Sequence, residues 1–406
     1  MHTDSVYDEL GVPAVLNAAG TKTRIGGSRI RPAALEAMNR AAESFVRLSD
    51  LQACASDRIA AATGAEAGYV TAGAASALTL GAAACIASDD LGTMARLPTL
   101  DEPAEIVMPR THRTGYDHAL RAAGAEIVDV GTNDRHLGTG SRNTEPWEIA
   151  DAITERTVAV AYMAKEYTEP PLSTVAAIAH DHDVPVIVDA AAELPPTRNL
   201  RRFVDAGADL VAFSGGKAIR GPQTTGILAG RRDLVASVAA QHLDMHAAED
   251  VWEPPHELLD PTDLGGVPRQ GIGRAMKVGK EELVGLLVAL EEFVDEDHEG
   301  LQATWHDRSR RVADALDPLP GVTTSVDAAD EVAVAPEVRV DVDPASAVAD
   351  ATTVVGALRR EDPRVFVGAD SLPAAFTVNP MCLDDDETTF VVDRLRAHLG
   401  GDEGRA

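Results

Sequence analysis

The sequence predicts an α/β protein with a mostly parallel sheet in a large domain and a smaller C-terminal α+β domain. Short runs of Val, Ile and Leu alternate with amphipathic helical segments, which is typical of a parallel sheet covered by helices on both faces. The chain has 406 residues, and a single core stops growing at roughly 250–300 residues, so two domains are expected. A stretch rich in Pro, Gly and acidic residues at 246–273 interrupts the alternation and reads as a long loop.

The elements of the large domain follow from the spacing of apolar residues. Two helices come first, over 31–48 and 50–64, and Gly64 ends the second one. Strands are expected at 67–70, 105–109, 126–131, 157–163, 185–190, 209–214 and 226–230. Helices are expected at 77–88, 115–124, 145–154 and 172–182. Sheets of this kind bind ligands at the carboxyl ends of their strands.

Four regions are expected along the chain. An N-terminal arm covers residues 1–30, and the large domain covers 31–273. A connecting helix lies within 274–297, where KEELVGLLVALEEFVDE is strongly periodic, and the small domain covers 298–406. The small domain is expected to contain helices at 308–316, 351–360 and 387–399 and strands at 321–326, 337–342, 364–368 and 375–379.

The charge balance is strongly acidic. There are 65 Asp and Glu against 36 Lys and Arg, a formal net charge of −29. The five lysines are Lys22, Lys165, Lys217, Lys277 and Lys280. Acid excess, scarce lysine and few aromatic residues are typical of a protein adapted to high salt, although an acidic protein from dilute medium is the plain alternative. We expect no nucleic-acid partner and no membrane attachment, because such a surface repels phosphate.

The cysteines and the start of the chain bear on location. Cys54, Cys85 and Cys382 lie far apart, with neither metal-ligand spacing nor a disulfide framework, so no metal site is expected and a reducing cytoplasm fits. No stretch approaches the roughly 18 apolar residues of a membrane helix. The polar start MHTDSVYDELG is not expected to act as a signal peptide.

Lys217 and Asp189 are the leading catalytic candidates. Lys217 follows an apolar strand in the turn SGGK, where burial lowers the pKa of a lysine and favours the neutral amine that attacks a carbonyl. A surface lysine is the alternative, which the scarcity of lysine makes weaker. Asp189 ends the strand VPVIVD, where an acid can cap a helix, bind a metal or pair with a pyridinium nitrogen. The two together match the way pyridoxal 5′-phosphate is held.

Two more segments complete the constellation. The turn TAGAAS runs into a helix, and the backbone at Gly73, Ala74, Ala75 and Ser76 suits a phosphate, with the Ser76 hydroxyl as a further donor. A close helix–sheet crossing explains the same composition equally well. His112 follows the strand EIVMP, where its flat ring could stack on the pyridine ring, although alone it would be an ordinary loop histidine.

The order of these elements resembles that of fold-type I pyridoxal-phosphate enzymes, in the group of selenocysteine synthase and D-glucosaminate-6-phosphate ammonia-lyase-like proteins. The resemblance covers nearly the whole chain and is most specific in LNAAGTKTRIGGSRIRP, TGAEAGYVTAGAASALTLGAAACI, HRTGYDHALRAAGAEIVDVG, VDAAAELPP and FSGGKAIRGPQTTGILAGR. It implies the fold-type I transferase fold with its seven-stranded type of sheet, and pyridoxal 5′-phosphate as cofactor.

The resemblance also assigns roles. Lys217 would bind the cofactor aldehyde, Asp189 its ring nitrogen, and His112 the face of its ring. Gly73 to Ser76 and Ser214 would hold the phosphate. The arm, with Thr21 and Ser28, would reach the mouth of the active site. An arm that lies on the surface away from the site is nearly as good an interpretation. The basic residues expected to meet a substrate anion are Lys22, Arg24, Arg29, Arg269 and Arg274.

Two departures from the family pattern stand out. Selenocysteine synthases carry an extra N-terminal tRNA-binding domain, and the similarity here begins about 15 residues from Met1, so we expect that domain to be missing. Arg47 stands where the family leads us to expect an acid, near the subunit interface. Fold-type I active sites are generally built at such an interface, and we therefore expect a homo-oligomer, at least a dimer.

The expected function is that of a pyridoxal-phosphate-dependent lyase that acts by elimination on a small amino compound and releases ammonia and a keto acid, with an amino-sugar acid phosphate as one candidate. Aminotransferases usually bind the substrate carboxylate with an arginine on a small-domain strand, and AFTVNP has Asn379 instead. A transferase acting on seryl-tRNA, an aminotransferase and a racemase remain alternatives, because the same cofactor supports them. The complete Asp–Lys pair disfavours a binding protein without turnover.

Overall fold

A computed structural model describes residues 6–132, 144–165, 168–244, 247–327 and 335–400. The chain divides into two compact units, one of residues 30–295 and one of residues 1–29 with 296–406. In this division the N-terminal arm groups with the C-terminal residues, and the periodic helix after the long loop groups with the larger unit.

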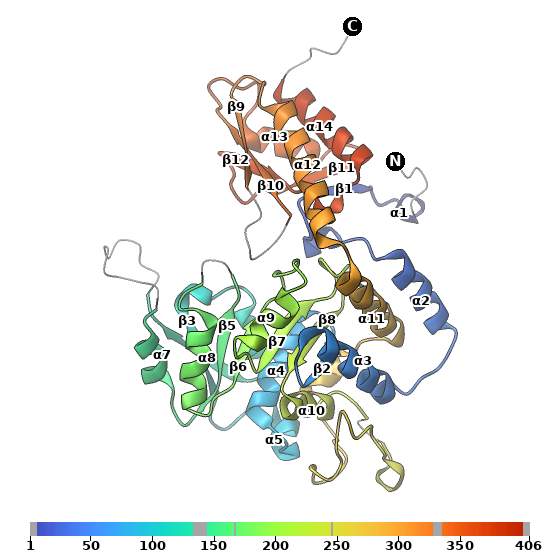
Figure 1. Cartoon of the computed structure of the whole chain (residues 1–406), viewed down its shortest axis with the longest axis vertical. Coiled ribbons are helices and arrows are strands. Elements are labelled where there is room, and N and C mark those ends of the chain that lie inside the picture. Colours follow the sequence, from blue (N-terminus) through green and yellow to red (C-terminus); the bar gives the residue numbers. More distant parts are fainter. Residues whose placement is uncertain (1–5, 133–143, 166–167, 245–246, 328–334, 401–406) are drawn as a thin grey trace. The chain divides into compact units, whose positions relative to one another are not determined.

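The larger unit is built on a seven-stranded sheet with the order β2-β8-β7-β6-β5-β3-β4 (Figure 1). Its strands are β2 (Ala67–Thr71), β3 (Ala104–Pro109), β4 (Ala125–Val130), β5 (Thr157–Met163), β6 (Val186–Asp189), β7 (Leu210–Ser214) and β8 (Gly226–Gly230). All of them run parallel except β8, which is antiparallel to both β2 and β7. The carboxyl ends of the six parallel strands therefore lie at one edge of the sheet.

Helices cover both faces of this sheet. They are α2 (Pro32–Ala42), α3 (Leu48–Thr63), α4 (Ala74–Ala87), α5 (Leu91–Arg96), α6 (Asp117–Ala122), α7 (Pro146–Ala152), α8 (Leu172–Asp181), α9 (Asn199–Asp205), α10 (Arg232–Ala240) and α11 (Lys280–Asp295), with 3-10 turns η2 (Arg110–His112), η3 (Glu249–Val251) and η4 (Ile272–Met276).

Alternate strand residues face the two helical layers, as the pleat requires. Ile187, Leu210 and Leu228 pack with α4 and α10 in one core cluster. On the other face, Phe213 meets Phe203 of α9, with ring centroids 6.2 Å apart. Both faces are therefore buried, which explains why the strands read as continuous apolar runs.

The smaller unit has a three-stranded antiparallel sheet, β12-β10-β9, and a two-stranded parallel sheet, β1-β11. The strands are β1 (Val15–Ala18), β9 (Val322–Asp327), β10 (Glu337–Val342), β11 (Arg364–Val367) and β12 (Ala375–Val378). The helices are α1 (Val6–Glu9), α12 (His298–Leu316), α13 (Ala351–Leu358) and α14 (Asp385–Leu399), with 3-10 turns η1 (Thr23–Ile25) and η5 (Pro380–Cys382). The predicted fold class, a mostly parallel α/β sheet with a smaller C-terminal α+β part, is confirmed.

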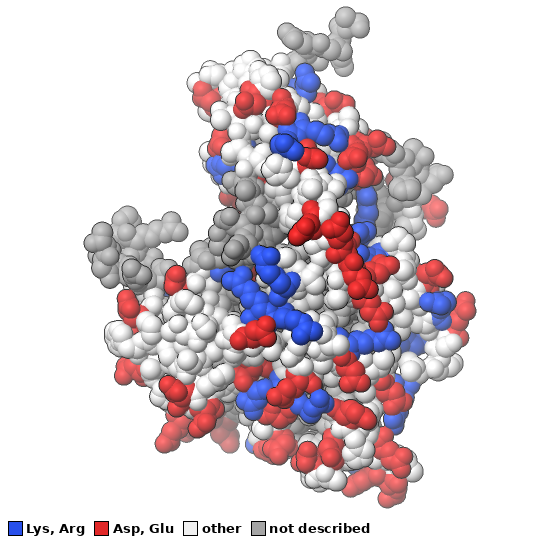
Figure 2. Space-filling view, viewed as in Figure 1, with Lys and Arg blue, Asp and Glu red and all other residues white. Residues whose placement is uncertain are grey.

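Acidic side chains are spread widely over the surface seen in Figure 2, as the net charge of −29 leads us to expect. Within the described ranges, no helix is both long enough and apolar enough to cross a membrane.

Candidate active site

Several candidate residues meet at the carboxyl edge of the large sheet. Gly226, which begins β8, pairs with Thr71 on one side and with Ser214 on the other. Beyond β7, Asp189 at the end of β6 pairs with Met163 at the end of β5. Since neighbouring strands lie about 4.8 Å apart, the turn after β2, the loop after β7 and the Asp189 carboxylate lie side by side.

The turn after β2 presents backbone N–H groups at the start of α4. Gly73 caps this helix of 14 residues with φ of 89°, and the first N–H groups of a helix, here on Ala74, Ala75 and Ser76, have no partner inside it. A Cβ on Gly226 would lie 2.4 Å from the Gly73 carbonyl carbon. The Ser76 hydroxyl donates to a carbonyl one turn earlier, at 2.9 Å, so its hydrogen is engaged within the helix.

Lys217 is half-buried on a loop that small residues hold closed. The Gly215 N–H donates to the Thr225 carbonyl at 2.9 Å, and the Gly221 N–H donates to the Gly215 carbonyl at 2.9 Å. A Cβ on Gly215 would lie 2.3 Å from Thr225 Oγ1 and 2.6 Å from Leu286 Cδ1 of α11. The tight approach of α11 thus depends on the glycine beside the lysine.

The buried Arg31 holds the far end of the Lys217 loop, a role that the sequence reasoning missed. Its side chain is among the few buried charges of the larger unit, with the residue 5% exposed. Nε donates to the Ile219 carbonyl at 2.9 Å, and the Arg31 N–H donates to the Arg220 carbonyl at 3.0 Å. Arg220 has φ of 61°, a left-handed backbone conformation that residues other than glycine rarely adopt. The contact with Arg31 therefore stabilises this turn.

Asp189 is half-buried, and opposing influences act on its carboxyl group. Burial raises its pKa, whereas the Ala191 N–H, 3.1 Å from Oδ1, and the positive charges of Lys217 and Lys165 lower it. Asp189 and Lys217, predicted separately from the sequence, are therefore within electrostatic range of each other.

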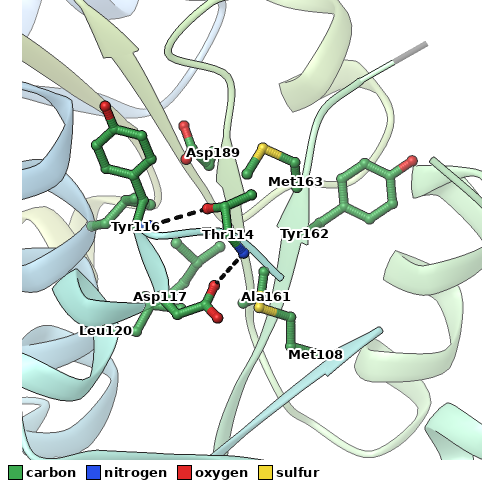
Figure 3. A pocket seen from close by; sticks show the side chains of 11 residues that line it. Met108, Thr114, Tyr116, Asp117, Leu120, Ala161, Tyr162, Met163 and Asp189 are labelled. Atoms are coloured by element: carbon green, nitrogen blue, oxygen red, sulfur yellow. Dashed lines mark hydrogen bonds between the residues drawn. The ribbon is translucent and has the colours of Figure 1, made fainter. Parts of the chain in front are cut away.

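A small cavity of about 20 Å³ lies beside Asp189, on the face of the sheet that α4 covers. It is lined by Leu78, Met108, Thr114, Tyr116, Asp117, Leu120, Ala161, Tyr162, Met163, Ile187 and Asp189. In Figure 3 the Tyr116 ring and the Asp189 carboxylate lie at the same end of this cavity. Its volume holds about one water molecule, so the cavity is a small recess beside the carboxyl edge of the sheet and is too small to hold a ligand by itself.

His112 is wholly buried in this structure, with no exposed surface. Its ring meets the Tyr162 ring edge-on at 4.7 Å between centroids, and Nδ1 lies 3.4 Å from the Met163 N–H. Burial lowers its pKa to about 4. The stacking role predicted for His112 would require this side chain to turn outward. Tyr116, from the same HRTGYD motif, is 59% exposed and lines the cavity; the sequence reasoning did not single it out.

Lys165 and Glu193 also lie at this edge and were likewise missed. Lys165 follows β5, and its Nζ forms an ion pair with the Glu193 carboxylate, whose side chain is 2% exposed. Asn199 Nδ2 donates to the Glu193 carbonyl at 2.7 Å. Burial raises the pKa of Glu193, and the charge of Lys165 opposes that rise. The scarcity of lysine and the VDAAAELPP motif were the available signals.

The predicted substrate-binding arginines of the larger unit are exposed. Arg269 lies in the long loop, with its guanidinium 3.6 Å from Glu249 and 3.3 Å from the Ala247 carbonyl. Arg274 lies in η4, and burial together with the charge of Arg274 lowers the pKa of His242 to about 4. The structure thus leaves both guanidinium groups on the surface.

The predicted arm residues belong to the smaller unit. Lys22 Nζ lies 3.7 Å from Asp370, and Arg29 forms an ion pair with Glu387. Arg24, in η1, is exposed. Their relation to the sheet edge of the larger unit stays a prediction.

The donor set of the edge fits pyridoxal 5′-phosphate. A glycine-capped helix start suits the phosphate, a carboxylate beside two lysines suits a protonated ring nitrogen, and an amine on a neighbouring loop suits the aldehyde. A Cβ added at Gly73 would meet no atom within 4 Å, so the space on that side of the turn is open. The described part of the chain shows no cluster of His, Cys, Asp or Glu suited to a metal ion.

Comparison with known proteins points the same way. The family described as aminotransferase class-V matches residues 115–249, which include Asp189 and Lys217. The chain is 34% identical to a 5′-C-glycyluridine monooxygenase-decarboxylase from Streptomyces sp over 97% of this chain and 92% of that protein. It is 30% identical to D-glucosaminate-6-phosphate ammonia lyase from Salmonella typhimurium, over 97% and 98%.

A solved structure of D-glucosaminate-6-phosphate ammonia-lyase superposes with a TM-score of 0.78 at 29% identity, covering 97% of this chain and 98% of that one. L-seryl-tRNA(Sec) selenium transferase from Nitratidesulfovibrio vulgaris is 26% identical over 95% of this chain and 82% of its own length. The resemblance predicted from the sequence motifs is confirmed.

Proposed function

The chain belongs to the fold-type I pyridoxal-phosphate-dependent enzymes of the class-V aminotransferase family, in the group of D-glucosaminate-6-phosphate ammonia lyase and selenium transferase, and from that premise we propose that it is a lyase releasing ammonia from a small amino compound. An amino-sugar acid phosphate is the leading substrate class. The observation that carries the proposal is the meeting of Gly73, Asp189 and the Lys217 loop at one sheet edge.

We assign the cofactor to this edge. Pyridoxal 5′-phosphate, when bound, supplies an electron sink for negative charge at the substrate carbon that bears the amino group. The backbone at Gly73 to Ser76, with Ser214, would hold the phosphate, and the Asp189 carboxylate would bind the ring N–H by a charge-assisted hydrogen bond. The Lys217 amine would bind the aldehyde, and its Nζ would be the group that takes up the proton from that substrate carbon.

The small-domain strand supports elimination over transamination. Asn379 follows β12 and is 2% exposed; its Nδ2 donates to Glu337 at 2.8 Å and its Oδ1 accepts from the Met381 N–H at 2.9 Å. Its side chain is therefore used within the unit and does not replace a carboxylate-binding arginine. Arg339, on the adjacent strand β10, is held by Asp341 and by Ser371. The substrate's anionic end is left to the arm residues and to Arg269 and Arg274.

The test is a screen of amino acids and amino-sugar acid phosphates for release of ammonia and a keto acid, in molar salt. Lys217→Met should abolish release, whereas Lys277→Met, an exposed lysine change in the same unit, should preserve it. Conversion of the cofactor to its amine form in proportion to product, reversed by an added keto acid, would instead identify an aminotransferase. Arg24→Ala should raise KM for a phosphorylated substrate far more than for its unphosphorylated analogue.

A second candidate is suggested by the 34% identity to the 5′-C-glycyluridine monooxygenase-decarboxylase. An enzyme of that kind acting on an amino acid joined to a nucleoside would consume oxygen and release carbon dioxide. The same screen, extended to such compounds with an oxygen electrode, separates the two candidates. Oxygen uptake without ammonia release would favour this second reading.

We also propose that the protein is a homo-oligomer in the cytoplasm. Exposed apolar side chains gather around α2 and the segment before α3, where Leu35, Phe45, Val46 and Leu48 are 37% to 103% exposed. A second copy would bury them, as apolar patches of this kind usually require. An active monomer by light scattering in high salt would contradict the proposal.

A further inference from the structure

The structure places four ionisable side chains on consecutive strand ends at the candidate active site. Lys165 follows β5, Asp189 and Glu193 lie at and after the end of β6, and Lys217 follows β7. The proposed chemistry uses Asp189 and Lys217. Lys165 and Glu193 have no role in it, although they occupy the same edge.

Strand register fixes how closely these groups lie. Asp189 pairs with Met163 of β5 and with Ala212 of β7, and the Ala164 N–H donates to the Asp189 carbonyl at 2.9 Å. Lys165 directly follows Ala164 along the chain. Asp189 therefore lies between the two segments that carry the lysines.

Lys165 is held through both its side chain and its backbone. Its Nζ pairs with the buried Glu193, and its carbonyl accepts from the Thr168 hydroxyl at 2.7 Å. The Thr168 hydroxyl also lies 3.0 Å from the Tyr162 hydroxyl. The Glu193 carboxylate holds the ammonium group at this edge, although the Lys165 side chain is 31% exposed.

The other ionisable groups near this cluster include Asp117, which lines the cavity beside Asp189, and Glu169 and Arg202, whose charges act on Tyr162. His112, beneath β5, is neutral because burial lowers its pKa to about 4, and burial raises the pKa of Tyr162, which keeps that phenol neutral. From α2, Arg31 binds the Lys217 loop at Ile219; from α11, Glu282 accepts from the Thr224 hydroxyl at 2.6 Å.

We propose that Lys165 and Glu193 form a positioning pair that keeps the Lys217 amine unprotonated and ready to react, an inference that rests on the proposed role of Lys217. The charge of Lys217 lowers the pKa of both Asp189 and Glu193, so both carboxylates lie within electrostatic range of Lys217 and favour its ammonium form. Lys165 neutralises Glu193 through direct contact, which weakens the effect of that carboxylate on Lys217. Loss of Lys165 would leave Glu193 uncompensated, and loss of the Glu193 charge would leave Lys165 uncompensated.

The two halves of the pair therefore have opposite effects, which a purely structural role would not produce. The test measures the reactivity of the Lys217 amine in the full chain freed of cofactor, by competitive reductive methylation and mass spectrometry from about pH 6 to 11. Lys165→Met should raise the pH midpoint of labelling at Lys217, and Glu193→Gln should lower it, each by on the order of one pH unit. The double variant and Lys277→Met should both label like the wild type.

Shifts in the same direction in both single variants, or no shift in either, would overturn the proposal. If Lys165→Met fails to fold, Glu193→Gln and the double variant still decide it, because the first must lower the midpoint and the second must restore it. Opposite shifts in a protein that releases no ammonia would leave this pair in place and overturn the lyase assignment. If the wild type releases ammonia but neither single variant shifts the pH midpoint of Lys217 labelling, the proposed role of the pair is overturned and the lyase assignment stands.

Discussion

Replacing Gly226 with alanine should displace the turn after β2, to which we assign the cofactor phosphate. A Cβ at this position would lie 2.4 Å from the Gly73 carbonyl carbon and 2.6 Å from the Ala74 nitrogen, whereas ordinary contacts begin near 3.4 Å. The two backbones must therefore separate by about 1 Å, the difference between 3.4 and 2.4 Å. Gly226 cannot move away freely, because it is paired with Thr71 and Ser214 on either side.

We expect two consequences of this displacement. Overpacking of backbone against backbone should lower the free energy of unfolding by about 1–3 kcal/mol. Backbone donors misplaced by about 1 Å should also weaken binding of pyridoxal 5′-phosphate by tenfold or more, roughly 1.4 kcal/mol. Urea unfolding at constant molar salt measures the first effect, and an absorbance titration with the cofactor measures the second.

Gly265→Ala is the matched control. Gly265 lies exposed in the long loop, and a Cβ there would meet nothing within 4 Å, so neither quantity should change. Cofactor binding as tight in Gly226→Ala as in Gly265→Ala would refute the assignment of residues 73–76 to the phosphate, even if stability falls. Unchanged stability would refute the packing estimate itself.

Four further outcomes are expected. Borohydride should fix the cofactor on Lys217 in peptide maps, and a label on any other lysine, or none, would contradict its role. Asp189→Ala should weaken cofactor retention and remove nearly all activity, since the charge-assisted bond to the ring is lost; near wild-type turnover would show Asp189 to be structural. Unfolding free energy should fall by about 3 kcal/mol per buried histidine as the pH drops from 6.5 to about 4, because His112 and His242 have their pKa lowered to about 4 in the folded chain and the unfolded chain binds more protons in that window. Urea unfolding at both ends of the window should show this fall, and His112→Gln should remove about half of it, because His242 still contributes. Dialysis to low salt should dissociate or unfold the protein, because the acidic side chains behind the net charge of −29 repel one another when the Debye length grows to about 30 Å at 0.01 M. A melting temperature that does not change with salt concentration would contradict adaptation to high salt.

Local pattern predicted all seven strands of the larger unit, but it missed the helices α5, α9 and α10 and extended the helix at 31–48 beyond its end at Ala42. The strand expected at 157–163 is found there without change, because a fully buried parallel strand is an unbroken apolar run. The helix expected to begin at residue 77 begins at Ala74, one turn earlier, because Gly73 already provides its cap. The start of a helix differs from its predicted position where backbone geometry, and not side-chain type, decides the first turn.

Strand direction and pairing depended on tertiary structure. The strand at 226–230 was expected, but its antiparallel direction follows from the loop after β7, which turns back within residues 215–225. The N-terminal arm was expected as a separate segment, yet its residues 15–18 form β1 and pair with β11 near the other end of the chain. A strand's partner depends on how distant segments pack, which no local periodicity records.

For the site, residue type and position along the chain determined Lys217, Asp189 and the Gly73 turn as candidates by themselves. Only the tertiary structure decided that Lys165 and Glu193 join them and that His112 is turned inward. The physical reason is register. The sequence shows which strand each residue ends, but the order of strands in the sheet decides which strand ends become neighbours, and the packing beneath them decides which side chains reach the edge.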